Sequence, residues 1–262
     1  MCICMLDLIW KYIYYSFNSY QIINITIIVL FISEIPTFFF TFLDVIKLDC
    51  LKKYRIHCYH CASKCIVLDK EKVYPKNKEI LYVFKESYKP FLKIYIPLIY
   101  FSSIIFSYYD YLPYRTDLEL PNVEYILLEL FIISIFGDLL FNLLHRLFHT
   151  KYLYQNFHKR HHEYHYTFAA VKHYLYNFEA FCFLLPPTIP PLLFNSHIMV
   201  MWLWIIIAQF AGTLGHCGYS IPLLNYLPTF TTEYHDKHHI LNNKNFGLLY
   251  VWLEKLLGTY SN

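Results

Sequence analysis

The chain has 262 residues, of which 57% are hydrophobic and 16% are charged. An average soluble chain is about a quarter charged, so this composition argues against an ordinary soluble domain. The formal net charge of +3 is too small to indicate a nucleic-acid-binding protein, and we expect no nucleic-acid partner.

Several apolar regions are long enough to cross a bilayer, which takes about 20 residues of helix. They cover residues 21–43, 91–109, 123–144 and 178–215. In the first region, Glu34 and Pro36 interrupt the apolar pattern, which predicts a kinked or re-entrant segment. In the last, the prolines between residues 186 and 191 predict two helices joined by a turn. We therefore expect an all-α fold, an integral membrane helical bundle with about four to five membrane helices, rather than a large soluble core.

The basic residues predict how these helices are oriented. Residues 44–90 hold 11 of the 22 Lys and Arg residues, which places this segment in the cytosol by the positive-inside rule. Following the crossings from there, the chain returns to the cytosolic face at residue 145 and again at residue 216. We therefore expect the histidine-rich segments to form a cytosolic, metal-binding cap on the bundle.

A short segment of the basic loop carries closely spaced cysteines and histidines. Cys58 and Cys61 form a CxxC pair, Cys65 follows, and His57 and His60 lie beside them. A structural zinc site needs four ligands, usually as two separated pairs, and no second pair lies nearby. Free cytosolic thiols are the favoured interpretation, with a zinc site as the alternative.

Histidines carry the most informative pattern. Twelve of the 14 lie between residues 145 and 239. Three groups have i,i+3 or i,i+4 spacing, which brings imidazoles together on one helical face. The groups are HRLFH with His145 and His149, HKRHH with His158, His161 and His162, and HDKHH with His235, His238 and His239. Outside these groups, His165, His173 and His197 are expected to include bystanders.

The number of imidazoles favours a dinuclear metal centre. A single tetrahedral zinc ion would use at most four of the eight. Imidazole suits iron, zinc, copper and nickel, and the Glu-x-x-His pairs of carboxylate-bridged di-iron bundles are absent. We favour two iron ions, because the site lies beside a membrane rather than in a hydrolase cleft. For any one group taken alone, the alternative to metal binding is that its histidines lie at the protein surface or at the membrane interface and bind no metal.

Asp138 lies on the membrane helix two turns before His145. Burying a carboxylate within a membrane span costs free energy, so such a residue is taken as a candidate functional residue. We expect Asp138 to accept the N–H of a ligand histidine and so to fix the tautomer of that ring. The alternative is a helix-end carboxylate that reaches outward to the interface.

The three histidine groups, in this order and separated by membrane helices, resemble the sterol desaturase/fatty acid hydroxylase superfamily of integral-membrane di-iron oxygenases. The similarity covers roughly residues 91–260. It rests on DLLFNLLHRLFH (138–149), FHKRHHEYHYTFAA (157–170), HCGYSIP (216–222), YHDKHHILNNKNFG (234–247) and VWLEKLLGTY (251–260). Sterol 4-methyl oxidases and cholesterol 25-hydroxylase-like proteins are the most similar members. Three positions depart from the family pattern: Glu254 replaces Asp, Cys217 replaces Ser, and Tyr176 replaces a histidine.

This resemblance implies a membrane-bound oxygenase that hydroxylates a C–H bond of a sterol or another lipid with O2. It implies two iron ions held by the eight histidines of the three groups, with His216 as a possible ninth ligand. Electrons would come from cytochrome b5 or its reductase, for which the basic loop is a candidate contact. The implied location is the endoplasmic reticulum membrane. The implied division is a membrane segment with a basic cytosolic loop (1–90) and a fatty acid hydroxylase-like catalytic domain (91–262).

Other functions fit parts of the same pattern. A fatty acid or sphingolipid hydroxylase, or a lipid desaturase, would use the same metal centre. A histidine-rich membrane metal carrier belongs to another class, and an inactive lipid-binding relative is a third alternative. The completeness of the three histidine groups counts against the inactive relative.

Overall fold

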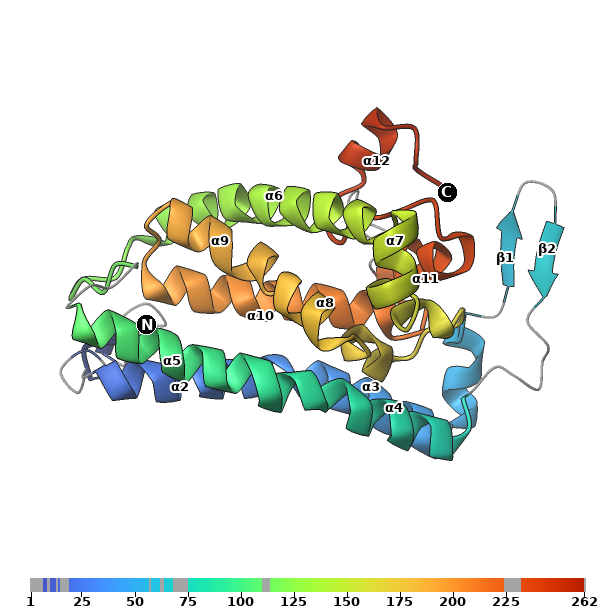
Figure 1. Ribbon diagram of the computed structural model, residues 1–262, viewed down its shortest axis with the longest axis horizontal. Helices are drawn as coiled ribbons and strands as arrows, with labels where there is room; N and C mark the ends of the chain where they lie inside the picture. The colour runs from blue at the N-terminus through green and yellow to red at the C-terminus, as the bar shows by residue number, and fades with distance from the viewer. Residues whose placement is uncertain are drawn as a thin grey trace.

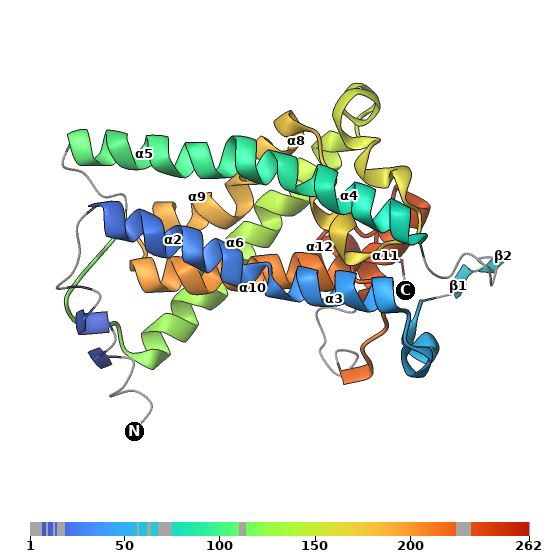
Figure 2. The same cartoon turned by 90° about the horizontal axis from the view of Figure 1, so that it is seen from below.

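The computed structural model describes residues 7–8, 10–12, 14, 19–56, 58–61, 64–67, 75–109, 114–223 and 232–261. Long helices lie side by side along the length of the molecule, and short helices and loops gather at one end of them (Figure 1). The view from below shows the same arrangement, with α11 and α12 at that end (Figure 2). The expected all-α bundle with a histidine-rich cap is therefore confirmed.

Among the described residues, four helical segments are long and apolar enough to cross a membrane. They are Asn24–Ile46, formed by α2 (Ser19–Ser33) and α3 (Ile35–Ile46); Asn77–Phe106, formed by α4 (Asn77–Pro90), the π-helical turn η3 (Phe91–Tyr95) and α5 (Ile96–Tyr108); α6 (Val123–Phe148); and α10 (Ile198–His216). Large apolar side chains on α3, α5 and α6 are exposed, as lipid-facing helices require.

The first span is interrupted where the sequence predicts it. Helix α2 ends at Ser33, Glu34 lies between the helices, and Pro36 occupies the first turn of α3. A proline there costs no helical hydrogen bond, because the first N–H groups of a helix have no intrahelical acceptor. Glu34 is 1% exposed, so the break turns a carboxylate into the bundle.

The second span begins earlier than the apolar pattern suggests. Helix α4 starts at Asn77 and runs on through η3 into α5, past the domain division predicted at residue 90. Its inward face buries Ile80, Val83 and Ser87, while its other side exposes lysines together with Leu81 and Tyr82. Pro90 lacks an N–H, and the helix continues past it through one π-helical turn, a common adjustment to a missing hydrogen bond.

The proline-rich region corrects the prediction that the prolines form a turn between two helices. They lie instead inside a short helix, α9 (Leu185–Leu193), which follows α8 (Asn177–Cys182) and precedes α10. Pro186 and Pro187 lie in its first turn, where a missing N–H costs nothing. Pro190 and Pro191 each remove one later hydrogen bond, and the helix ends after nine residues. Short α9 runs beside α6, α8 lies against η3 and η4 (Tyr154–His158), and α10 returns the chain to the cap (Figure 1).

Helix α6 has its polar side chains on the inside. Ser134, Asp138 and Asn142 follow at four-residue spacing, and His145 continues this buried face. Apolar side chains such as Phe131 are exposed on the opposite face. Polar groups within a membrane span are stable only when they face the bundle interior and find partners there. This face therefore delivers His145 to the interior at the cap.

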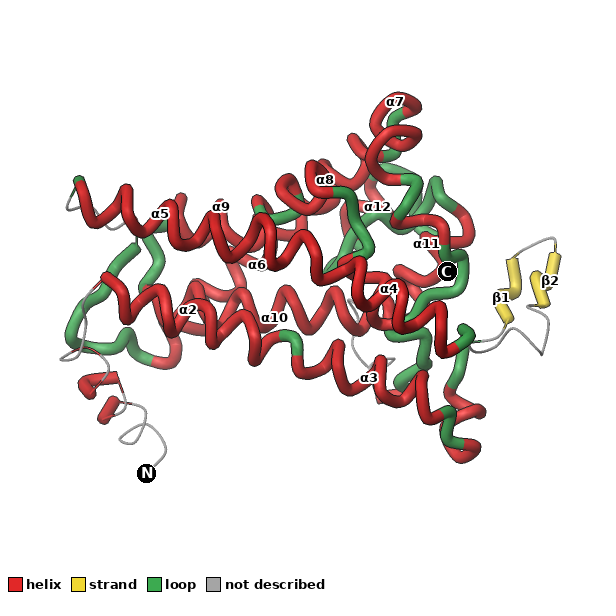
Figure 3. The backbone as a smooth tube through the Cα atoms, turned by 60° about the horizontal axis from the view of Figure 1, so that its bottom comes forward, coloured by secondary structure: helices red, strands yellow, loops and turns green. Residues whose placement is uncertain are grey.

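The short segments complete the fold. The 3-10 helix η1 (Asp49–Tyr54) follows α3, and strands β1 (Cys58–Cys61) and β2 (Lys64–Val67) pair antiparallel in a hairpin beyond the cap (Figure 3). The sequence did not predict this hairpin. The side chains of Cys58, Cys61 and Cys65 lie outside the described residues, so the question of zinc binding stays open. The other segments are α7 (Lys151–Leu153), η4 (Tyr154–His158), η5 (His161–Glu163), η6 (Ala169–His173), α11 (Thr232–Leu241) and α12 (Trp252–Leu256).

Replacing Gly137 of α6 by alanine is expected to destabilise the bundle. An added Cβ would overlap the indole ring of Trp204 on α10 and lie 3.2 Å from the carbonyl oxygen of Pro186 on α9. Overpacking of this kind costs about 1–3 kcal/mol. SDS titration of the protein in mixed micelles would measure the loss. Leu127→Ala, on the exposed face of α6, is the control, and equal stability of Gly137→Ala and wild type would contradict this packing.

Candidate metal centre

Nine histidines from distant parts of the chain converge at the cap. They come from the end of α6, from η4 and η5, from the last residue of α10, and from α11, all of which meet at one end of the bundle (Figure 3). They form two groups, and within each group the candidate ligand nitrogens all lie within 4.8 Å of one another. The first group is His145, His149, His158, His162 and His238, and the second is His161, His216, His235 and His239. The structure thus brings together every histidine predicted as a ligand, His216 included.

In the first group, the Nε2 atoms of the five rings lie close together. His158 Nε2 lies 3.0 Å from that of His149, 3.0 Å from that of His162 and 3.2 Å from that of His145. His238 Nε2 lies 3.1 Å from that of His149 and 3.2 Å from that of His162. Five nitrogens therefore surround one point.

The hydrogen bonds of the Nδ1 atoms show which Nε2 atoms carry no hydrogen. His145 Nδ1–H donates to the carbonyl of Phe246 at 2.8 Å, and His238 Nδ1–H donates to the carbonyl of Lys244 at 2.6 Å. A neutral imidazole that donates through Nδ1 keeps a lone pair on Nε2. His145 and His238 therefore present Nε2 lone pairs to the neighbouring imidazoles, and a cation between these nitrogens would satisfy the lone pairs.

In the second group too, ring nitrogens lack hydrogen-bond partners. His216 Nδ1–H donates to the Gly212 carbonyl at 2.7 Å, and its Nε2 lies 3.2 Å from that of His161. His235 and His239 are buried, and neither ring nitrogen of either residue has a hydrogen-bond partner. A buried polar atom without a partner costs about 1–3 kcal/mol. Four such atoms in one place indicate that the partner is an ion.

The distances fit metal coordination. With metal–imidazole bonds of about 2.1 Å, neighbouring ligands lie about 3.0 Å apart at right angles and about 3.4 Å apart in a tetrahedron. The observed separations of 3.0–3.2 Å fall in this range. Five nitrogens in the first group exceed the four of a closed structural zinc site. The residues present therefore fit two metal ions with imidazole ligands.

Burial keeps these imidazoles neutral, which is the form that binds metal. Desolvation lowers the pKa of His149 to about 2, with a smaller contribution from His145. Burial first, and neighbouring imidazoles second, hold the pKa well below its usual range in the other ligand histidines outside the membrane spans. These are His158, His161, His162, His235, His238 and His239.

Glu179 is a site residue that the histidine pattern did not reveal. This α8 carboxylate is fully buried and accepts a hydrogen bond from His158 Nδ1–H. A carboxylate on the far nitrogen of a ligand histidine fixes the tautomer and makes the ring a better donor. The available signal was a lone glutamate in the apolar stretch that follows the second histidine group.

Asp138 has partners other than the expected histidine. Its carboxylate accepts hydrogen bonds from the backbone N–H groups of Leu248 and Leu249 at 2.9 and 2.7 Å, and of Tyr250 at 3.2 Å. No described histidine is among its hydrogen-bond partners, so its proposed contact with a ligand ring stays a prediction without that support. Asp138 instead fixes the segment 248–250, which follows Phe246.

Glu254, one of the departures from the family pattern, holds the same segment from the other side. The buried carboxylate accepts hydrogen bonds from Asn142, from Arg146 at 2.8 Å and from the Gly247 N–H at 3.1 Å. It thereby ties α12 to α6 and to the residue next to Phe246. The carbonyl that orients His145 is therefore fixed by carboxylates on two different helices.

The three expected bystander histidines lie outside both groups. His165 Nδ1–H donates to the His239 carbonyl at 3.3 Å, and His197 accepts from the Met199 N–H at the start of α10. His173 contacts Glu34. These contacts give the three residues roles in packing or in other sites.

A cavity opens beside the histidines and extends into the membrane part of the bundle. At one end it reaches the candidate ligand histidines, among them His161 and His216. Its walls are mostly apolar and come from α6, α9 and α10 and from the segment that Asp138 holds; they include Phe141, Leu184, Trp204 and Leu249. A hydrocarbon bound in this cavity would therefore lie beside the candidate metal centre.

Glu179→Gln is expected to weaken metal binding without unfolding the protein. The amide keeps the shape but lacks the charge that His158 contacts, and such changes cost about 10–100-fold in metal affinity. Competition with a calibrated chelator would measure the affinity. Glu163→Gln, which affects only an outer hydrogen bond from Tyr174, is the matched control. An unchanged affinity in Glu179→Gln would rule out this role.

The metal-free protein is expected to lose stability as the pH falls below about 6.5. Unfolded imidazoles take up protons near that pH, whereas the buried ones, with lowered pKa values, do not. The unfolded state then binds more protons, and each such histidine lowers the free energy of unfolding by about 1.4 kcal/mol per pH unit. Unfolding at pH 7.5, 6.5 and 5.5 after chelation tests this. His239→Ala should reduce the slope, and a flat profile in wild type would contradict the burial of neutral rings.

Comparison with known proteins gives the family. The fatty acid hydroxylase family model matches residues 130–259, which contain all nine histidines. Human fatty acid hydroxylase domain-containing protein 2 is 35% identical over 166 residues, which cover 62% of this chain and 48% of that protein. The chain thus spans about half the length of this relative. No solved structure matches this chain.

Plant relatives match over nearly the whole chain. Methylsterol monooxygenase 2-2 of Arabidopsis thaliana is 27% identical over 95% of this chain and 90% of its own length. Very-long-chain aldehyde decarbonylase GL1-8 of Oryza sativa subsp. indica is 26% identical over 97% and 91%. With the histidine groups and the membrane bundle already in place, these matches show that the chain belongs to the sterol desaturase/fatty acid hydroxylase superfamily.

Proposed function

We propose that the protein is a membrane-bound di-iron oxygenase that hydroxylates a C–H bond of a sterol or another lipid. The single observation that carries the proposal is the pair of buried imidazole groups, with lone pairs facing one another, at the end of an apolar cavity. Relatives named methylsterol monooxygenase support the reaction class. In the overall reaction, a C–H bond, O2, two electrons and two protons give an alcohol and water.

Two iron ions bound to these groups would activate O2 for attack on an unactivated C–H bond. Five histidines would hold one ion and four the other. The Phe246, Lys244 and Gly212 carbonyls and the Glu179 carboxylate orient four of the rings, so the nitrogens are in place before an ion binds. Such preorganisation keeps the ligand geometry from changing during the reaction.

The cavity walls perform the other part of the task. Phe141 and Phe183 contact the ring of His145, and together with Leu184 they present an apolar surface to the substrate. An apolar wall binds hydrocarbon and excludes water, which limits the loss of a reactive oxidant to side reactions. A lipid dissolved in the bilayer would enter between the helices rather than from the aqueous side.

We infer that the cap faces the cytosol of the endoplasmic reticulum membrane and that cytochrome b5 or its reductase supplies the electrons. The excess of Lys and Arg in residues 44–90 supports the orientation. An acidic electron donor would be attracted to the same segment. We also propose the division into a membrane segment (1–90) and a catalytic domain (91–262), which the family resemblance implies.

Removing one ligand from either group is expected to abolish product formation. His161→Ala opens the second group and His238→Ala the first, and each should lower the iron content from two per protein toward one. Metal analysis and Mössbauer spectroscopy measure the ions, and lipid profiling of expressing cells measures the product. His165→Ala, outside both groups, is the matched control.

The product also separates the alternative functions. A new alcohol supports the hydroxylase, whereas a new double bond would show a desaturase with the same centre. A metal carrier would exchange its ions readily and consume no O2 with a reductant. If His161→Ala folds and leaves the sterol and acyl profiles unchanged, the oxygenase proposal is wrong.

A further inference from the structure

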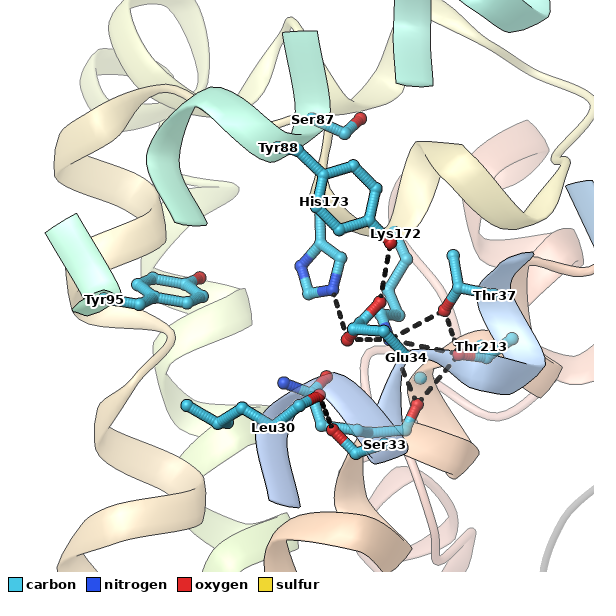
Figure 4. A network of polar contacts seen from close by, with 12 residues as sticks. Leu30, Ser33, Glu34, Thr37, Ser87, Tyr88, Tyr95, Lys172, His173 and Thr213 are labelled. Carbon is cyan, nitrogen blue, oxygen red and sulfur yellow. Dashed lines mark hydrogen bonds and ion pairs between the residues drawn. The ribbon is translucent and has the colours of Figure 1, made fainter. Parts of the chain in front are cut away.

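A buried polar cluster lies on the wall of the cavity, away from the metal-binding histidines. Its centre is Glu34, at the break between α2 and α3. The Glu34 carboxylate accepts hydrogen bonds from Lys172 Nζ at 3.1 Å, from His173 Nε2–H at 3.0 Å and from the hydroxyl of Tyr88 at 2.9 Å (Figure 4). Lys172 and His173 also line the cavity. None of these groups is needed to hold the metal ions.

The Lys172 ammonium group has several hydrogen-bond partners. Besides Glu34, its ammonium group contacts the hydroxyls of Thr37 and Thr213 at 3.2 and 3.0 Å and the Gln209 carbonyl at 3.3 Å. Glu34 and Lys172 thus balance each other's charge inside the bundle and join α3, η6 and α10 (Figure 4). Removing either one would leave a buried charge unpaired, which is strongly destabilising. The Glu34–Lys172 pair therefore fixes the side chains around it, among them His173.

His173 has one ring nitrogen left for a ligand. Because Nε2–H donates to Glu34, a neutral ring carries a lone pair on Nδ1. Burial lowers the pKa of His173, which favours the neutral ring. In Figure 4 the second nitrogen points away from the carboxylate. No described residue hydrogen-bonds to it, although the residue lines the cavity, so His173 offers the cavity a hydrogen-bond acceptor.

Gln209 supplies a donor on the same wall. Its backbone carbonyl accepts from Lys172, but its side-chain amide has no hydrogen-bond partner among the described residues. It lies one turn before Thr213 on α10 and seven residues before His216. At 1.5 Å per residue, this corresponds to about 10 Å along the helix from the second histidine group. On a mostly apolar wall, an amide without a protein partner is available to a polar group of a ligand.

We propose that His173 and Gln209 form a subsite that binds the hydroxyl group of a lipid in this cavity. The hydroxyl would donate to His173 Nδ1 and accept from the Gln209 amide. This inference rests on the proposed function and narrows its substrate class to lipids with a free hydroxyl. A ketone, ester or ether oxygen only accepts hydrogen bonds, and it would leave Nδ1 unsatisfied. Glu34 and Lys172 are positioning residues, because they fix the His173 ring and do not touch the lipid.

The position of the subsite also bears on which carbon is oxidised. The hydroxyl is held on the cavity wall about two helical turns of α10 away from His216. The lipid would therefore present to the metal centre a carbon other than the one that carries the hydroxyl. The apolar walls between the two places, including Phe141 and Phe183, would contact the intervening hydrocarbon.

Equilibrium binding without turnover tests the subsite. The purified protein in nanodiscs, without reductant, would be given cholesterol or its methyl ether, and 1-octadecanol or its methyl ether. The two pairs distinguish a sterol from a long-chain alcohol as the source of the hydroxyl. Wild type should bind one alcohol at least about tenfold more tightly than its ether, as expected for a buried hydrogen bond. His173→Phe and Gln209→Leu should each reduce this preference to about twofold or less.

The controls make the result decisive. Leu127→Ala, on the exposed face of α6 and outside the cavity lining, should keep the preference. If His173→Phe fails to fold, Gln209→Leu decides alone, because its amide supports no other residue. Equal binding of alcohol and ether by wild type in both pairs, or a preference that survives in Gln209→Leu, overturns the subsite. Because no turnover is involved, a hydroxyl preference in a protein without oxygenase activity would refute the proposed function and leave the subsite intact.

Discussion

The structure depends on one electrostatic constraint: lone pairs of neutral imidazoles face one another inside the protein. The Nδ1–H groups of His145, His216 and His238 are committed to backbone carbonyls, so their Nε2 atoms cannot donate. Such an arrangement is unfavourable in the absence of a cation and favourable around one. The metal centre is therefore built into the hydrogen bonds of the cap, and metal binding contributes to the stability of the fold.

Two carboxylates hold the segment that carries one of those carbonyls. The Phe246 carbonyl belongs to a segment fixed by Asp138 from α6 and by Glu254 from α12. Carboxylates that accept several backbone N–H groups are rigid supports, because each bond restrains the same two oxygens. The replacement of aspartate by Glu254 is compatible with this role, since its carboxylate reaches both α6 and the segment. Residues that touch no metal thus determine where the ligands lie.

The membrane shapes the bundle in a complementary way. Helix α6 exposes apolar side chains and buries its polar ones, and the first span breaks at Glu34 to place a carboxylate inside. In a bilayer, a buried charge must find a partner within the protein. The Lys172 ammonium group is that partner, and the pair leaves His173 and Gln209 at the cavity wall. An apolar cavity with a few polar groups is the form that lipid recognition requires.

The sequence alone determined the membrane bundle, the break at Glu34 and the set of nine histidines, because hydropathy, prolines and imidazole spacing are local signals. It misplaced the start of the second span and the prolines of α9, where context decides whether a helix continues. Only the tertiary structure divided the histidines into groups of five and four and brought Glu179 to His158. It also directed Asp138 to a backbone segment more than a hundred residues away. The Glu179 and Asp138 pairings join residues 21 and 111 positions apart, and packing rather than spacing decides which residues meet.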